Sequence, residues 1–121
     1  HHIMIKRSAE LTVREREEVR GGVGKLYFHD FLKKEESFGA GSLFSKTVIP
    51  AGASIGEHRH DGEFEVYYIL TGTAEVTDNG TVATLHAGDM HLCVSGGTHA
   101  LRNPSEEDLE VIMLILNEKA R

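Results

Sequence analysis

Turn-forming residues interrupt this chain at short intervals, and this spacing limits the folds that it can adopt. The clearest signal is Asn79-Gly80 between two β-branched runs, because a two-residue hairpin turn needs a positive φ at both central residues. Strands that recur about every eight to twelve residues are typical of antiparallel sandwiches and barrels, and no long helix is predicted. We therefore expect an all-β fold, an antiparallel double-stranded β-helix that closes as a jelly-roll β-barrel.

The expected strands are rich in β-branched and aromatic residues, which favour an extended backbone. Besides the segment that carries His58 and His60, they cover residues 25–31, 42–49, 64–70, 73–77, 81–85, 90–94, 99–102 and 108–116. Residues 32–36 are long enough for one helical turn only. With 121 residues, the chain has room for one domain with a core of its own.

The N-terminal third differs from the rest of the chain. We interpret residues 1–3 as the remnant of an affinity tag, residues 4–41 as an N-terminal arm with a first strand, and residues 42–121 as the barrel. Residues 8–21 are dense in charge, which indicates a solvated and partly irregular leading segment. A partner-binding arm is the alternative for this segment. All parts are expected to form a single domain.

The charge balance argues against some partners. The chain has 13 basic and 19 acidic residues and a formal charge of −6, whereas nonspecific binding to nucleic acid or to a membrane surface needs a basic face. No apolar run approaches the roughly 20 residues of a membrane span, and no signal peptide is apparent. The single cysteine, Cys93, excludes an internal disulfide. A cytoplasmic protein is expected.

Three residues of types that bind metals, His58, His60 and Glu65, lie within eight residues of one another. Side chains two residues apart in a strand point to the same face, so both imidazoles can reach one point. Residues 61–63 are predicted to turn the chain, and if the next strand lies beside the first, Glu65 faces the same point. Two imidazoles and a carboxylate are the outline of a transition-metal site. A fourth ligand is expected from elsewhere.

Two motifs resemble those of the cupin superfamily. The first has intervals of five, one, four and six residues between Gly52, His58, His60, Glu65 and Gly72. The second has intervals of five, one, two and three residues between Gly88, Val94, Gly96, His99 and Asn103. It departs from the family pattern at Val94, where the family carries a proline that shapes a turn. The 15 residues between the motifs suit the small single-domain members.

The resemblance implies that His99 joins His58, His60 and Glu65 as the ligands of one divalent transition metal per chain. Mn, Fe, Ni, Co, Cu and Zn all accept imidazole and carboxylate ligands. On a six-coordinate ion, one or two positions stay open for a ligand. A hydrogen-bonded cluster without metal is the alternative, although buried polar groups without partners cost roughly 1–3 kcal/mol each.

Other side chains near the ligands are candidates with a second interpretation each. Tyr67 has the parity of Glu65, and it either hydrogen-bonds a ligand or packs in the wall. His91 is a candidate acid/base group, or else a surface residue or a histidine with its hydrogen bonds satisfied; Cys93 is an apolar filler or a reactive thiol. The sequence leaves open whether their face of residues 90–94 points inward. Residues expected on the surface or turned away from the metal are His29, Lys46, Arg59, His86 and Arg102.

For the function, the resemblance implies two alternatives. The first is a metal-dependent enzyme of dioxygenase, decarboxylase or isomerase type that acts on a small carboxylate-bearing or enolisable molecule. The second is a non-catalytic cupin that binds or senses a small molecule. The compact chain is similar to single-domain cupins of the oxalate decarboxylase-like group. Because a small barrel has sheet edges to cover, a homodimer is also expected.

Overall fold

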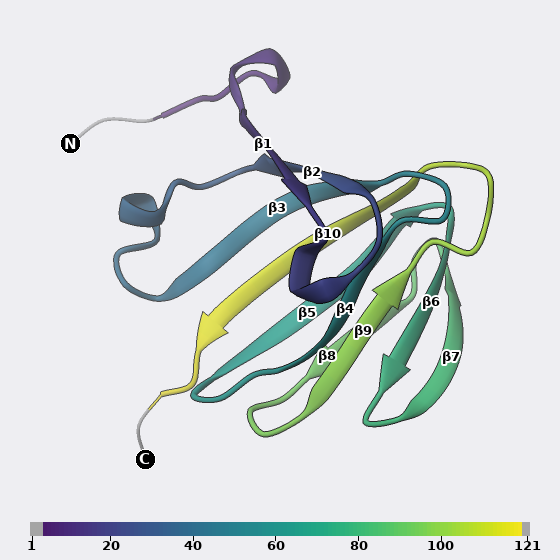
Figure 1. Ribbon diagram of the computed structural model, residues 1–121. Helices are drawn as coiled ribbons and strands as arrows, with labels where there is room; N and C mark the ends of the chain where they lie inside the picture. The colour runs from purple at the N-terminus through teal and green to yellow at the C-terminus, as the bar shows by residue number, and fades with distance from the viewer. Residues whose placement is uncertain (1–3, 120–121) are drawn as a thin grey trace.

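The computed structural model describes residues 4–119, which fold into two facing antiparallel sheets (Figure 1). The strands are β1 (Thr12–Glu17), β2 (Lys25–Asp30), β3 (Gly41–Ile49), β4 (Ser54–Arg59), β5 (Glu63–Thr71), β6 (Thr73–Asp78), β7 (Thr81–His86), β8 (Met90–Cys93), β9 (Thr98–Arg102) and β10 (Leu109–Asn117). One sheet has the order β1-β2-β3-β10-β5-β8 and the other β4-β9-β6-β7. The predicted jelly roll is confirmed. Residues 1–3, interpreted as a tag remnant, lie outside the described residues.

Helical structure between residues 4 and 119 is confined to three single turns of 3-10 helix, η1 (Ser8–Glu10), η2 (Val19–Gly21) and η3 (Lys34–Ser37). No helix in this part of the chain is long and apolar enough to cross a membrane. The predicted hairpin turn is present, since Asn79 and Gly80 have φ values of 46° and 86° and join β6 to β7. The eight strands for which bounds were predicted form with their ends within one residue of the prediction. The strand expected to carry His58 and His60 is β4, which ends at Arg59 and leaves His60 just outside it.

The charged leading segment contains more structure than predicted. Its residues 12–17 form β1, which pairs along its whole length with β2, and β2 pairs in turn with β3. Five of the six side chains of β1 are exposed, and that of Arg14 is half-buried. The strand therefore lacks the apolar alternation by which sequence analysis finds strands. The arm thus continues the larger sheet.

β4 and β5 are not neighbours, although the sequence analysis considered that arrangement. β4 pairs with β9 in the smaller sheet, whereas β5 lies between β10 and β8 in the larger one. Residues 60–62 carry the chain from one sheet to the other. Glu65 therefore meets His58 across the barrel, not along one sheet. Turn residues predict a reversal of the chain, but they do not determine which sheet the next strand joins.

The apolar core fills the space between the sheets. Its fully buried members include Leu26, Ile49, Ile69, Leu101, Leu109 and Val111. Burial of each large aliphatic side chain contributes roughly 1.5–3 kcal/mol. Asn103, the last residue of the second motif, is also buried, and its Nδ2 donates to the carbonyls of Ile49 and Glu107 at 2.8 and 2.7 Å. It thereby holds the corner after β9.

Candidate metal centre

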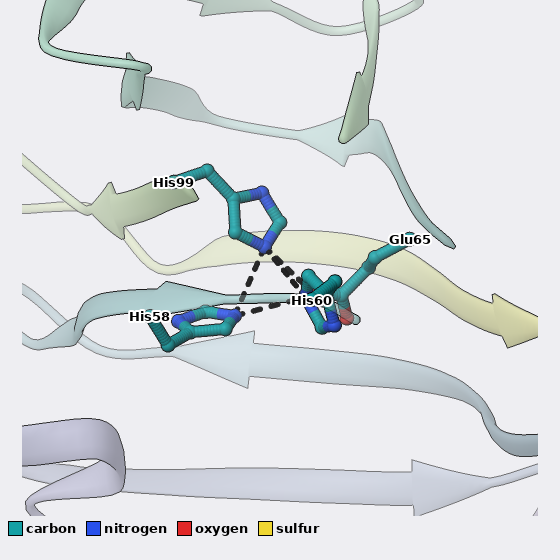
Figure 2. Close-up of side chains that lie close together, drawn as sticks. All are labelled: His58, His60, Glu65 and His99. Atoms are coloured by element: carbon teal, nitrogen blue, oxygen red, sulfur yellow. Dashed lines mark hydrogen bonds and ion pairs between the residues drawn. The ribbon is translucent and has the colours of Figure 1, made fainter. Parts of the chain in front are cut away.

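Three histidines and a glutamate from both sheets converge inside the barrel (Figure 2). The Nε2 of His99 lies 2.9 Å from Nε2 of His58 and 3.0 Å from Nε2 of His60. Oε1 of Glu65 lies 3.0 Å from Nε2 of both His60 and His99, and 3.6 Å from Nε2 of His58. The structure therefore brings together all four residues that the sequence analysis selected as metal ligands.

The backbone bulge in β4 and hydrogen bonds to the outer ring nitrogens orient these histidines. β4 carries one extra residue between the pairs Ile55↔Leu101 and His58↔His99, and such a bulge redirects the side chains that follow it. Nδ1 of His58 lies 2.8 Å from the carbonyl oxygen of Gly56, to which an Nδ1–H donates. A partner on the outer ring nitrogen favours the tautomer whose Nε2 lone pair can bind a metal.

His60 has a carboxylate partner that sequence analysis missed. Oε1 of Glu63 lies 2.9 Å from Nδ1 of His60, although the sequence placed Glu63 in the turn between two strands. It is instead the first residue of β5, from which it reaches back to His60. No spacing rule signals this contact, because it depends on how residues 60–62 cross between the sheets.

The charges in the cluster are coupled. Burial alone would raise the pKa of Glu65, but the imidazoles of His58, His60 and His99 around the carboxylate outweigh burial and hold this pKa well below its ordinary value. The hydrogen bond to Glu65 raises the pKa of His60, with a smaller contribution from Glu63. The pKa of His99 is lowered by its burial. Glu65 is therefore an anion at neutral pH.

Hydrogen bonds within the cluster cannot pair all of its nitrogen and oxygen atoms. Nε2 of His99 has three neighbours at 2.9–3.0 Å, namely two imidazole nitrogens and a carboxylate oxygen. One N–H at this position can point to one neighbour only, which leaves other lone pairs facing one another. A cation at the centre attracts all four atoms. The spacing also fits, because two ligand atoms about 2.1 Å from one ion are about 3.0 Å apart when they subtend a right angle.

A pocket of about 230 Å³ opens onto one side of the cluster, which we call the open side. His58, His60, Glu65 and Tyr67 contribute polar atoms to its lining. The rest of the lining is apolar except for Ser42 and two arginines; it comprises Arg14, Val19, Arg20, Phe28, Ser42, Leu43, Ile55, Met113 and Ile115. Drug-sized ligands occupy pockets of about 300–1,000 Å³, so this one suits a small molecule.

The opposite side of the cluster, formed by His91, Cys93 and His99, is closed. His99 is completely buried, its Nδ1 lies 3.1 Å from Nε2 of His91, and its ring stacks on Tyr67 at 4.7 Å between centroids. His91 and Cys93 point inward, which settles the face of β8 that the sequence left open. His91 lies behind His99 and outside the pocket lining. It is buried and hydrogen-bonded to His99, so it is not on the surface and fits the expectation of a satisfied histidine.

The remaining predicted residues lie away from the cluster. Arg59 is exposed and pairs with Asp61 at 2.9 Å, as expected from its parity. Lys46 pairs with Glu110, and Arg102 with Glu75, outside the pocket. His86 is exposed and His29 is half-buried. Arg14 and Arg20 were not predicted as pocket residues, because the contact between arm and barrel has no local sequence signal.

Comparison with known proteins places the chain in a family. The family model described as the cupin domain matches residues 45–115, more than half of the chain. The chain belongs to the cupin family. An oxalate-binding protein of Thermotoga maritima is 38% identical to this cupin over 113 residues, which make up 93% of each chain.

Solved structures agree with this assignment. The crystal structure of a predicted oxalate decarboxylase from Thermotoga maritima matches this cupin with a TM-score of 0.90 at 37% identity, over 95% of this chain and 100% of that one. The cupin domain of Schizosaccharomyces pombe Cnp3 matches with a TM-score of 0.69 over 88% of this chain and 70% of that one. Its identity of 19% shows a shared fold alone.

Proposed function

We propose that this cupin holds one divalent transition metal through His58, His60, Glu65 and His99 and binds a small carboxylate at that metal. The observation that carries the proposal is the convergence of three imidazole nitrogens and one carboxylate oxygen beside a pocket of about 230 Å³. Mn, Fe, Co, Ni, Cu and Zn all suit this ligand set. When bound, such a metal supplies positive charge that stabilises negative charge on a ligand's oxygens.

The chain's own residues would hold the ligand in a defined place. A divalent ion and the ionised carboxylate of Glu65 together carry one net positive charge, which favours an anionic ligand. The apolar side chains of Phe28, Met113 and Ile115 line part of the pocket, and apolar surroundings strengthen electrostatic attraction. Tyr67 stays a neutral phenol, because burial raises its pKa well above the ordinary value.

The relatives support the class of ligand. The Thermotoga maritima relative is described as oxalate-binding, and the similar crystal structure as that of a predicted oxalate decarboxylase. We therefore propose oxalate, or a carboxylate of similar size, as the ligand of this cupin. The formal charge of −6 supports a small-molecule ligand over nucleic acid or a membrane surface.

Turnover of decarboxylase, dioxygenase or isomerase type is the enzymatic form of this proposal, and binding without turnover is the second candidate. One observation favours the second. Apart from the candidate ligands, the described residues of the pocket lining include no histidine and no carboxylate, the groups that most often serve as acid–base catalysts. His91, the sequence candidate for acid–base chemistry, lies behind His99.

Metal analysis and calorimetry test the proposal. After loading with Mn²⁺ and removal of free ion, we expect one metal per chain, and we expect oxalate to bind the loaded protein but not the metal-free one. A protein that retains no Mn, Fe, Ni or Zn when these are offered in excess would overturn the proposal. Assays for carbon dioxide, formate and peroxide in the presence of oxygen then separate the candidates. Stoichiometric binding without product identifies the non-catalytic cupin.

We also propose that arm and barrel form one domain of a cytoplasmic homodimer. The pairing of β2 with β3 supports one domain, and the free, buried thiol of Cys93 is compatible with a reducing compartment. A group of exposed apolar side chains on the outer faces of β5 and β8 supports the dimer. Its members are Tyr68, Leu70, Met90 and Leu92. Sedimentation that shows only a 13.3 kDa species would contradict it.

A further inference from the structure

The η2 turn brings part of the charged arm to the pocket. Its backbone rests directly on β4, because a Cβ on Gly22 would overlap the carbonyl group of Ser54, and a Cβ on Gly56 would overlap the carbonyl oxygen of Arg20. The amide of Val23 donates to Oγ of Ser54 at 2.8 Å, and the amide of Ser54 donates to the carbonyl oxygen of Val23 at 2.8 Å. In Figure 1 this turn follows β1 and lies against the barrel. Its position is therefore set by backbone contacts.

The conformation of η2 is unusual for the residues that it contains. Arg20 has φ 54° and ψ 31°, and Glu18 has φ 51°, both in the left-handed region. Residues with side chains seldom adopt this region, and such outliers cluster at binding sites. The backbone of Arg20 lies very close to Gly56. The left-handed conformation therefore lets the arm reach the strand that carries His58.

Of the two arginines in the pocket lining, Arg14 is already paired. Its Nη2 donates to Oδ1 of Asp30 at 2.9 Å, and its guanidinium lies 4.7 Å from the centre of the Phe28 ring. Arg20 is different, because between residues 4 and 119 no carboxylate forms a salt bridge with it and its side chain makes no hydrogen bond. It lines the same pocket as Tyr67 and the candidate ligands His58, His60 and Glu65. Within residues 4–119, Arg20 is thus a pocket cation without a salt-bridge or hydrogen-bond partner for its side chain.

We infer that Arg20 binds the anionic end of the ligand at the metal and makes this site selective for doubly charged carboxylates. This inference rests on the proposed metal site. A divalent ion beside ionised Glu65 carries one net positive charge, and Arg20 adds a second. A dicarboxylate such as oxalate balances both charges, whereas a singly charged ligand leaves one unpaired. Guanidinium also offers two parallel N–H donors, which match the two oxygens of a carboxylate.

Calorimetry with two ligands of equal size tests this inference. Oxalate carries two negative charges, and its monoamide oxamate carries one and offers similar oxygens to a metal. Their affinity ratio is measured for the Mn²⁺-loaded wild-type protein and for the variants R20Q, R20K and R16Q. Arg16 is the matched control, because it is an exposed arginine on β1 outside the pocket lining. Mn²⁺ affinity and melting temperature are measured for each protein.

We expect R20Q to lower the oxalate-to-oxamate ratio about tenfold, as expected for loss of a charged hydrogen bond. R16Q should keep the wild-type ratio. R20K should keep much of the ratio, because it preserves the charge, and should bind oxalate less tightly, because it lacks the paired donors. Mn²⁺ affinity should be the same in all four proteins, since the charge of Arg20 is not part of the ligand set.

An R20Q ratio equal to that of R16Q would overturn the inference and leave the proposed function intact. A wild-type protein that binds Mn²⁺ but neither acid, or that binds no metal, would instead overturn the proposed function. If R20Q fails to fold, R20K decides. If R20K loses more affinity for oxalate than for oxamate, the role of Arg20 is supported. If R20K binds both ligands as tightly as the wild type does, or loses the same affinity for both, the role is refuted.

Discussion

The two sides of the candidate metal centre are built from different kinds of contact. On the closed side, His99 has no exposed surface, stacks on Tyr67 and is backed by His91. On the open side, His58 faces a pocket that also receives Arg20, whose side chain has no salt-bridge partner within residues 4–119. Buried and paired groups have one stable arrangement, whereas an unpaired cation beside solvent can pair with an incoming anion. The closed side is therefore suited to fix His99 in place, and the open side, onto which the other three candidate ligands face, to select the molecule that binds there.

Substitution of His99 should have the largest effect. H99A removes a ligand from the closed side, and we expect Mn²⁺ affinity to fall by more than about a hundredfold, beyond the range seen for residues that only support ligands. Equilibrium metal binding measures the effect. H86A, which removes an exposed histidine, should bind Mn²⁺ like the wild type. Wild-type affinity in H99A would remove His99 from the ligand set and erase the difference between the two sides.

Substitution of His91 tests whether the closed side positions His99. H91F keeps an aromatic ring but removes the hydrogen-bond partner of Nδ1 of His99. Loss of such a partner typically lowers metal affinity about 10- to 100-fold, and the oxalate-to-oxamate ratio should not change. M90A, on the exposed face of the same strand, is the control. If H91F binds Mn²⁺ like M90A, the backing of His99 is not needed for metal binding.

Metal affinity should depend on pH through His60. Its hydrogen bond to Glu65 raises its pKa above the ordinary 6.5, so the metal-free ring keeps its proton to a higher pH and the metal must displace it. Affinity for Mn²⁺ should therefore rise with pH, and fall about tenfold for each unit of pH below the raised pKa. The difference in melting temperature between loaded and metal-free protein, measured from pH 8 to pH 6, reports this. A difference that is constant or grows toward pH 6 would contradict the sign.

Substitution of Gly56 should have a smaller effect, confined to the open side and to stability. In G56A the new Cβ would overlap the carbonyl oxygen of Arg20, so η2 must move away from β4, at a cost of about 1–3 kcal/mol in unfolding free energy. We expect the oxalate-to-oxamate ratio to fall several-fold. The double variant G56A/R20Q should show no further fall in this ratio, because both changes remove the same interaction. Additive effects would show that Gly56 acts independently of Arg20.

Much of the site follows from local rules. Alternation along an extended segment places His58 and His60 on one face, and the resemblance of the two motifs to those of the cupin superfamily adds Glu65 and His99; the structure brings these four side chains together. The expected strand and turn positions likewise depend on short-range preferences, as at Asn79-Gly80. Short-range preferences of this kind act within a few residues, so they can be predicted without knowledge of the rest of the fold.

The sequence by itself therefore determined the jelly roll and the identity of the four converging residues. Only the tertiary structure decided that β4 and β5 belong to different sheets, that His91 lies behind His99, and that Arg20 reaches the pocket. The physical reason is the range of the interactions. Backbone preferences and side-chain alternation are set within a few neighbouring residues, whereas the choice of sheet and the docking of the arm depend on contacts between residues far apart in the chain.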